Sequence, residues 1–416
     1  MSAFVLAKNT FWGLLSHILS RGSLMLTSIL IARSVDVSSF ASYAYFQLTV
    51  SMLAAYASMG VGIAASRFFA GLNHQNDVNQ EGIIAALITI SLILAITAFV
   101  LVMLVPTYWL SANTAVPKWL MALGVFALTL NIVPAGGILG LEKYRDATLV
   151  YFLSAVVLIS WTIWAITLKN ITLAILGVVV TSLFQTFGET LIIILSLGWR
   201  RIMDGFPFQR ADVVRILSFA GPMFLISILS GTGAWMIGRI ILLGSGGGHA
   251  FALFSIGLQW FSLSMVLPGM LSRVMLPRLV AGLNNQTNSG TKHRELKIAM
   301  LMATVSTSAM FVLALMLGDL VLGFYGKNYQ VGRWLIAAYF LPSIFAANCI
   351  VLGNSIIVSE YQWNWLQFSG LWFFILCFIA YLFQDQGVWA GSISYTFAYL
   401  AMLLTSFIFA RRNGLV

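Results

Sequence analysis

A few ionisable side chains lie inside long apolar stretches of this chain, well away from its polar segments. Arg21 falls near the middle of the first such stretch with His17 one helical turn before it, and Glu189 falls near the middle of another. Arg239 lies about one turn from the end of a third. Arginine keeps its charge and binds phosphate through paired hydrogen bonds. We therefore expect Arg21 and Arg239 to bind an anionic group. We expect Glu189 and His17 to be polar groups that couple this binding to the exchange of an ion.

Each of these residues also has a purely structural explanation. A charge at the centre of a bilayer costs at least roughly 2.5–3.5 kcal/mol, so it must face a partner or a water-filled cavity. Arg21 and Glu189 have similar depths and opposite signs, and either pair as a salt bridge or line one aqueous lumen. Arg239 can extend its guanidinium to the membrane surface, and His17 can be a polar packing residue. The sequence leaves these alternatives open.

The composition places these residues in a membrane protein. Hydrophobic residues make up 60% of the chain and charged residues only 8%, whereas soluble domains carry roughly 25% charge. A soluble chain of this length could not bury so much apolar surface in one core. The net charge of +10 comes from short segments between apolar stretches and not from a basic face, so nucleic acid is not an expected partner.

Twelve apolar stretches are long enough to cross a bilayer, which takes about 20 residues of helix. The sequence therefore predicts an all-α polytopic membrane protein of about twelve transmembrane helices, the first of them retained and not cleaved as a signal peptide. The predicted spans are residues 10–32, 40–66, 82–105, 119–141, 148–168, 171–197, 216–243, 250–276, 298–324, 334–358, 363–383 and 388–410.

Lysine and arginine are distributed unequally between the two sides of these spans. If the N-terminus is cytoplasmic, most of them fall inside, and the outer side holds only Arg33, Lys118, Lys169, Lys327 and Arg333. Cytoplasmic loops carry an excess of positive charge. With an even number of spans, we therefore expect both termini in the cytoplasm.

The chain matches itself at a shift of about 211 residues. RFFAGLNHQ at 67–75 matches RLVAGLNNQ at 278–286, Arg200–Arg201 match Arg411–Arg412, and Phe40–Ala41 match Phe251–Ala252. Because six spans is an even number, the two halves, 1–205 and 206–416, have the same orientation. Parallel repeats of this kind are typical of transporters that open a cavity between two six-helix lobes alternately to each side.

Motifs of enzymes and of metal sites do not occur in the sequence. No Gly-rich phosphate loop precedes a Lys-Ser or Lys-Thr pair, and there is no His/Glu metal motif or Ser-His-Asp set. Cys349 and Cys377 both lie in apolar stretches, which is typical of packed thiols and not of a disulfide or metal site. We expect a transporter, not an enzyme, with no metal and no cofactor.

Several short segments resemble the bacterial polysaccharide exporters. They are NTFW at 9–12, LIAR at 30–33, FASYAY at 40–45, SFAGP at 218–222, FSI at 254–256 and LP at 276–277. In length and layout the whole chain is similar to O-antigen flippases of the Wzx type. These belong to the superfamily of multidrug, oligosaccharidyl-lipid and polysaccharide exporters.

This resemblance implies a V-shaped pair of lobes around a cationic lumen. It implies transport of an undecaprenyl-diphosphate-linked oligosaccharide, an O-antigen repeat unit, from the cytoplasmic to the periplasmic leaflet of the bacterial inner membrane, coupled to a proton or cation gradient. The expected partners are this lipid-linked oligosaccharide, the phospholipid bilayer, and the polymerase and chain-length proteins of the same pathway. The lumen arginines that would meet the diphosphate are Arg21, Arg239, Arg33 and Arg273. Arg33 can instead cap the first helix, and Arg273 can anchor the eighth helix to anionic lipid.

Three other classes of function fit these residues less well. A cation-coupled multidrug antiporter of the same superfamily would need acidic residues for its coupling ion, and Glu189 is the lone deep candidate. A membrane polymerase or ligase would carry a large outer loop, whereas every predicted outer loop is short. A major-facilitator transporter would carry a Gly-rich motif with acidic and basic residues after its second helix, which residues 67–77 lack.

Overall fold

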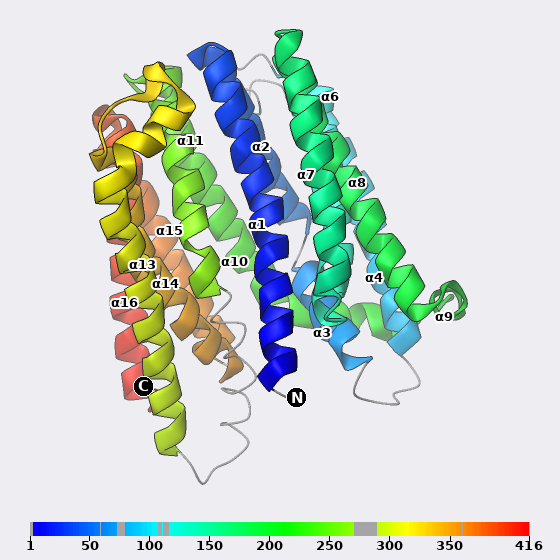
Figure 1. Ribbon diagram of the computed structural model, residues 1–416. Helices are drawn as coiled ribbons and strands as arrows, with labels where there is room; N and C mark the ends of the chain where they lie inside the picture. The colour runs from blue at the N-terminus through cyan, green and yellow to red at the C-terminus, as the bar shows by residue number, and fades with distance from the viewer. Residues whose placement is uncertain are drawn as a thin grey trace. The chain divides into compact units, whose positions relative to one another are not determined.

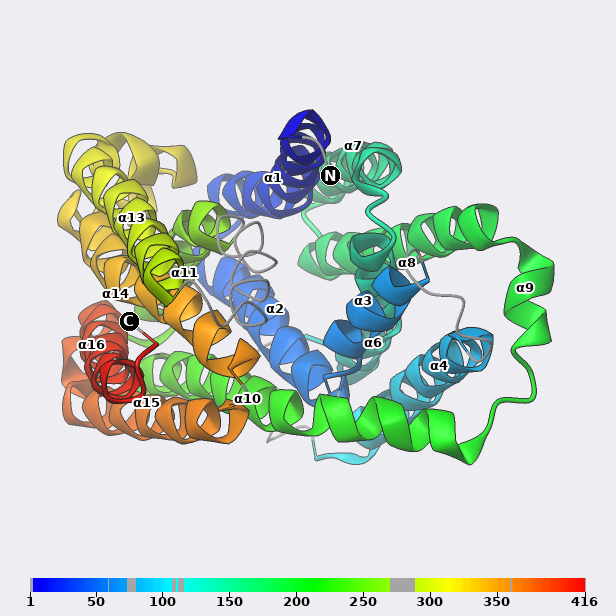
Figure 2. The same ribbon diagram turned by 90° about the horizontal axis from the view of Figure 1, so that it is seen from below.

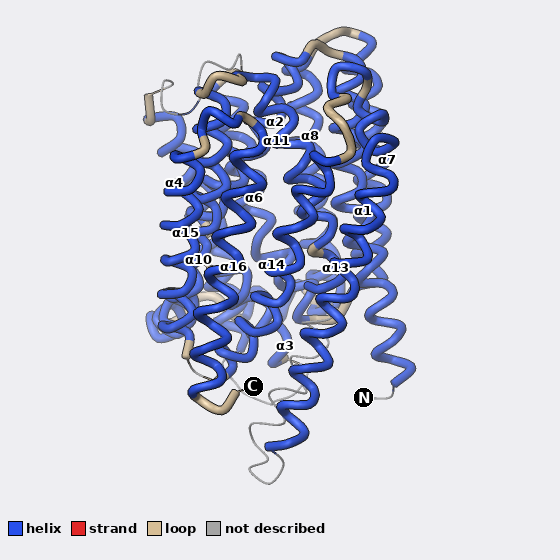
Figure 3. The backbone as a smooth tube through the Cα atoms, turned by 90° about the vertical axis from the view of Figure 1, so that its left-hand side faces the viewer, coloured by secondary structure: helices blue, strands red, loops and turns tan. Residues whose placement is uncertain are grey.

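The fold is helical throughout the described ranges of the chain. A computed structural model describes residues 3–58, 60–72, 80–106, 110, 116–269, 289–359 and 361–415, and every regular element within them is a helix (Figure 3). Apolar sequences form helices in a bilayer because a helix satisfies its own backbone hydrogen bonds where no water is available. The predicted all-α class is confirmed.

The chain divides into two compact units, Met1–Gly231 and Thr232–Val416, with the boundary inside α10 (Arg210–Leu243). The predicted lobes, 1–205 and 206–416, stay a prediction. The other helices of the first unit are α1 (Ala3–Ser34), α2 (Val37–Ala57), α3 (Val61–Gly71), α4 (Gln80–Leu104), α6 (Lys118–Gly140), α7 (Tyr144–Thr167), α8 (Ile171–Leu197) and α9 (Trp199–Asp204) (Figure 1). Those of the second are α11 (Gly247–Ser264), α13 (Ser289–Tyr325), η1 (Lys327–Tyr329), α14 (Trp334–Val358), α15 (Gln362–Leu382), η2 (Gln384–Gln386) and α16 (Val388–Arg412).

The predicted spans reappear as long apolar helices. Among the described residues, 11 helices can each cross a membrane, and there are up to 12 spans if the bent pair α2 and α3 counts as one. A continuous helix over 40–66 was expected here, but α2 and α3 meet at 59°. Gly60 at the break has a φ of +71°, where a side chain is strained, and a Cβ there would lie 2.7 Å from the carbonyl oxygen of Ala220 in α10. The span therefore bends where only glycine fits.

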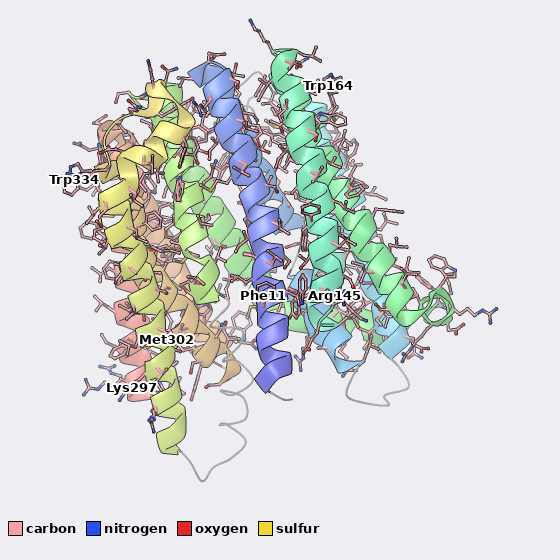
Figure 4. All side chains as sticks on the ribbon, viewed as in Figure 1. Phe11, Arg145, Trp164, Lys297, Met302 and Trp334 are labelled. Atoms are coloured by element: carbon pink, nitrogen blue, oxygen red, sulfur yellow. The ribbon has the colours of Figure 1, made fainter. Side chains whose placement is uncertain are left out.

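Several helices continue beyond the apolar stretches that predict them. α10 begins at Arg210 and α13 at Ser289, so the polar segments 200–214 and 280–297, which lie between predicted spans and were expected as loops, are partly helical. Lys, Glu and Arg are good helix formers and extend a helix past the hydrocarbon. Figure 4 shows Lys297 near one end of α13 and Arg145 near one end of α7. The loop expected at 200–214 also contains α9, which Figure 2 shows at the edge of the first unit.

The matched segments of the repeat have similar environments where both are described. Phe40–Ala41 in α2 and Phe251–Ala252 in α11 are all buried, with at most 3% of their surface exposed. Arg200–Arg201 and Arg411–Arg412 are all exposed. Residues 278–286, which match 67–75 in sequence, lie outside the described residues. Equal burial at matched positions fits a duplicated fold.

Small residues hold α3 against α6. A Cβ on Gly136 would lie 2.4 Å from the carbonyl oxygen of Gly62, and one on Gly140 would lie 2.5 Å from that of Ser66. Gly136 and Gly140 are four residues apart and therefore share one face of α6. Lipid supplies no hydrophobic force between helices, so close backbone contact of this kind is what stabilises the pair.

Replacing Gly140 with alanine should lower the stability of the protein by roughly 1–3 kcal/mol, because the added methyl group forces α3 and α6 apart. Gly370→Ala in α15 is the matched control, since nothing lies within 4 Å of a Cβ there. Alanine at that helical position should be neutral or slightly stabilising. Thermal unfolding of the purified variants in detergent measures both effects, and equal midpoints for the two variants would contradict the close contact.

Candidate functional site

Arg21 is an exposed arginine in the middle of a membrane-spanning helix. The apolar part of α1 is Phe11–Ser34, so at 1.5 Å per residue Arg21 lies roughly 15 Å from the first end of this span. Its side chain is exposed, although α1 packs along α7 in the first unit (Figure 1). An arginine that stays exposed at this depth is too costly to leave in hydrocarbon. The exposed face of α1 at Arg21 is therefore expected to meet water.

Glu189 of α8 is fully buried, with 0% of its surface exposed. Both of its carboxyl oxygens accept hydrogen bonds. The hydroxyl of Tyr151 in α7 donates to Oε1 at 2.5 Å, and the side-chain amide of Asn131 in α6 donates to Oε2 at 2.9 Å. An ionised carboxylate only accepts, whereas a protonated one must also donate. Two donors therefore suit the charged form, and a proton on Oε1 would reverse the bond with Tyr151.

Tyr151 lies between the two charged residues. Its hydroxyl contacts Glu189 and also interacts electrostatically with the guanidinium of Arg21. No salt bridge joins Arg21 to Glu189 among the described residues, whereas Arg201 of α9 pairs with Glu81 of α4 at 2.8 Å. Arg21 and Glu189 are thus linked through Tyr151 and not by a direct ion pair. A change in the charge of Glu189 would reach Arg21 through this phenol.

Close helix packing brings the donors to the carboxylate. A Cβ on Gly188, next to the carboxylate, would lie 2.7 Å from Cγ1 of Val150 in α7. A Cβ on Gly137 of α6 would lie 2.7 Å from Cδ1 of Ile193 in α8. Both glycines let α8 approach its neighbours more closely than any larger residue would. The hydrogen bonds of Glu189 to α6 and α7 depend on these contacts.

The other predicted site residues are more scattered. His17 is half-buried on α1, and Arg33 is exposed in the last turn of that helix. Arg239 lies in the second unit, half-buried, with its guanidinium carbon 5.2 Å from the ring centre of Trp235. That contact is a cation–π interaction. Arg273 lies outside the described residues. The roles of these four residues in binding or coupling stay predictions.

Sequence reasoning did not identify the two hydrogen-bond partners of Glu189, Asn131 and Tyr151. Asn131 could have been found, because it is a side-chain amide in the middle of the apolar stretch 119–141. A buried amide needs a partner, and Glu189 lies at a comparable depth. Tyr151 gave no such signal, since tyrosine near the end of a span is common at membrane interfaces.

Metal-binding chemistry finds no support in the described ranges. No group of three or more His, Cys, Asp or Glu side chains there could hold a metal ion. Cys349 and Cys377 are both free thiols. The ionisable groups next to Tyr151 are a guanidinium, which can bind an anion, and a carboxyl, which can exchange a proton.

A family model for polysaccharide biosynthesis proteins matches residues 6–281 of the chain. The chain belongs to this family. A curated relative, the EPS I polysaccharide export inner membrane protein EpsE of Ralstonia nicotianae, is 20% identical over 401 residues. The match covers 94% of this chain and 90% of that one. The expected membership among polysaccharide exporters is confirmed.

Solved transporter structures share the fold. An inward-facing multidrug resistance MATE family transporter of the MOP superfamily matches with a TM-score of 0.78 and 15% identity, over 95% of this chain and 94% of its own. A MOP superfamily transporter from Pyrococcus furiosus matches with a TM-score of 0.75 and 15% identity, over 98% and 95%. At this identity the likeness establishes the fold alone. The protein is a multi-pass membrane protein with the MOP superfamily fold.

Removing the Tyr151 hydroxyl should destabilise the protein by roughly 1–3 kcal/mol, because the buried carboxylate of Glu189 loses a donor. A double-mutant cycle of Tyr151→Phe and Glu189→Gln should give a coupling free energy of at least about 0.5 kcal/mol. Tyr381→Phe, at a tyrosine that is 64% exposed, is the control and should have little effect. Additive effects of Tyr151→Phe and Glu189→Gln would contradict the hydrogen bond.

Proposed function

We propose that this protein is a flippase for an undecaprenyl-diphosphate-linked oligosaccharide, such as an O-antigen repeat unit. It would move this lipid from the cytoplasmic to the periplasmic leaflet of a bacterial inner membrane. The observation that carries the proposal is the exposed Arg21 in the middle of a span, in a chain of the polysaccharide biosynthesis family. The name of the Ralstonia nicotianae relative, a polysaccharide export inner membrane protein, supports a polysaccharide cargo and an inner-membrane location.

A cationic, water-facing route is what this cargo requires. The sugar hydroxyls would lose their hydrogen bonds in about 30 Å of hydrocarbon. The diphosphate carries negative charge, which a guanidinium binds through paired, charge-assisted hydrogen bonds. Arg21 supplies such a group at mid-membrane depth. Arg33, Arg239 and Arg273 are the further arginines that we propose for the lining of the route.

We assign Glu189 the role of coupling transport to a proton gradient. When ionised, its negative charge lowers the positive potential around Arg21 through the intervening Tyr151. Exchange of a proton at Glu189 would change this potential and with it the attraction of Arg21 for the diphosphate. Binding of the head group would thereby be linked to proton exchange. His17 is a second polar group on the same helix as Arg21.

The charge distribution supports an orientation with both termini in the cytoplasm. In that orientation the cargo is received where lipid-linked sugars would be assembled and released where a polymerase would join them. The proposed partners are therefore the polymerase and chain-length proteins of the same pathway, together with the surrounding phospholipids. The protein itself would act as a transporter, with no covalent step.

A multidrug antiporter is the second candidate, because the fold is shared with MATE transporters. That function would use Glu189 for its coupling ion and would have less need of Arg21. A strain that lacks the gene distinguishes the two candidates. Loss of surface glycan with unchanged drug susceptibility supports the flippase, and the opposite result supports the antiporter.

Arg21→Ala should abolish or strongly reduce surface glycan when it replaces the wild-type gene, because the diphosphate loses its mid-membrane partner. Arg21→Lys should retain part of the activity, since lysine keeps the charge but not the paired geometry. Arg145→Ala is the control, an exposed arginine at the end of α7 (Figure 4). Immunoblots of surface glycan, at matched expression, measure all three. Wild-type glycan with Arg21→Ala would rule out this role for Arg21.

Glu189→Gln should uncouple transport from the proton gradient, because glutamine keeps the hydrogen-bonding shape but cannot exchange a proton. In membrane vesicles, an uncoupler should slow the wild type and should have little effect on the slower Glu189→Gln variant. Asp385→Asn, at an exposed residue, serves as the control and should respond like the wild type. Glu189→Gln vesicles that transport at the wild-type rate and still respond to the uncoupler would exclude Glu189 as the coupling group.

A further inference from the structure

A groove lies at the C-terminal end of α16 in the second unit. It has a volume of about 400 Å³ and is lined by Phe407, Ile408, Arg411 and Arg412. Residues four apart share one face of a helix, so each apolar side chain lies next to one arginine along the axis. Phe407 is 37% and Ile408 52% exposed, and both arginines are exposed. The groove thus has an apolar part, formed by Phe407 and Ile408, next to a pair of guanidinium groups.

The end of α16 is held in a fixed conformation. Gly414 has a φ of +64°, and the backbone N–H of Leu415 donates to the carbonyl of Ala410 at 2.8 Å. These features form the turn that commonly closes a helix with glycine. The side chain of Asn413 donates to the carbonyl of Phe409 at 2.9 Å. The turn that carries the arginines is therefore ordered before any ligand binds.

Aromatic contacts fix the same turn from α15. The ring of Phe409 lies with its centre 5.4 Å from that of Tyr361 and 5.5 Å from that of Phe368. Phe409 is not among the residues that line the groove. The groove is left open while the helix end is packed.

The arginines of the groove have no acidic partner among the described residues. At the matching positions of the repeat, Arg201 forms an ion pair with Glu81 at 2.8 Å. No such pair is formed by Arg411 or Arg412 within the described ranges. Two guanidinium groups that form no ion pair with a described residue attract anions, and phosphate is the anion whose geometry suits arginine.

We propose that this groove binds an anionic phospholipid. The lipid phosphate would contact Arg411 and Arg412, and its acyl chains would cover Phe407 and Ile408. The span Val388–Arg412 ends at these arginines, which is the depth of lipid head groups. Basic residues next to a span attract anionic lipid in this way. The inference does not depend on the cargo that the protein transports.

The test measures binding of phosphatidylglycerol to the purified full-length protein by native mass spectrometry, with phosphatidylcholine as the neutral reference. The Arg411→Gln/Arg412→Gln variant should bind phosphatidylglycerol roughly 30-fold more weakly than the wild type. The Arg145→Gln/Arg200→Gln variant loses the same net charge from two exposed arginines elsewhere and should bind as the wild type does. Arg411→Lys/Arg412→Lys should give an intermediate affinity.

Three results would overturn the proposal. One is wild-type affinity in Arg411→Gln/Arg412→Gln, and another is an equal loss in Arg145→Gln/Arg200→Gln, which would mean diffuse attraction to surface charge. The third is a groove that binds farnesyl diphosphate but not phosphatidylglycerol, which would make it a site for lipid diphosphates. Unchanged thermal unfolding of the variants in phosphatidylcholine micelles establishes that each is folded.

Discussion

A carboxylate inside a bilayer must find its hydrogen-bond donors within the protein, because hydrocarbon offers none. Glu189 has two, the hydroxyl of Tyr151 and the amide of Asn131, and they come from two other helices. The packing of α6, α7 and α8 is therefore fixed by a polar contact as well as by the close approach at Gly188. Arg21 is an electrostatic neighbour of the same Tyr151.

The predicted repeat places both deep charges in its first half. Ile18–Ser20 match Ile228–Ser230 at a shift of 210 residues, and the later segments match at about 211, so the positions that match Arg21 and Glu189 are Gly231 and Leu400, which carry no charge. The second unit has an aromatic cluster in its core instead, where the ring centres of Trp372 and Tyr399 are 5.4 Å apart. A duplicated scaffold can thus keep its packing while the ionisable groups of one half take on a separate role.

The spans and the two deep charges were predictable from the sequence, because an apolar run of sufficient length and a charge inside it are local properties. The position of Tyr151 was not. It depends on how α7 is rotated about its axis. The residues of such a helix that face lipid are as apolar as those that face the protein, so no sequence pattern identifies the inner face. The bend at Gly60 also could not be predicted from the sequence, because it depends on the carbonyl of Ala220, which is far away in the chain. The short matched segments were enough to predict the family. They were not enough to identify the substrate.

The central claim is that Arg21 meets the diphosphate of the cargo. The most direct test reconstitutes the purified protein in proteoliposomes and measures the flipping rates of two labelled lipids, one with the oligosaccharide on a polyprenyl diphosphate and one with it on a monophosphate. The wild type should prefer the diphosphate by about tenfold or more, the value of a charge-assisted contact, and Arg21→Ala should lose that preference. An undiminished preference in Arg21→Ala would contradict the account.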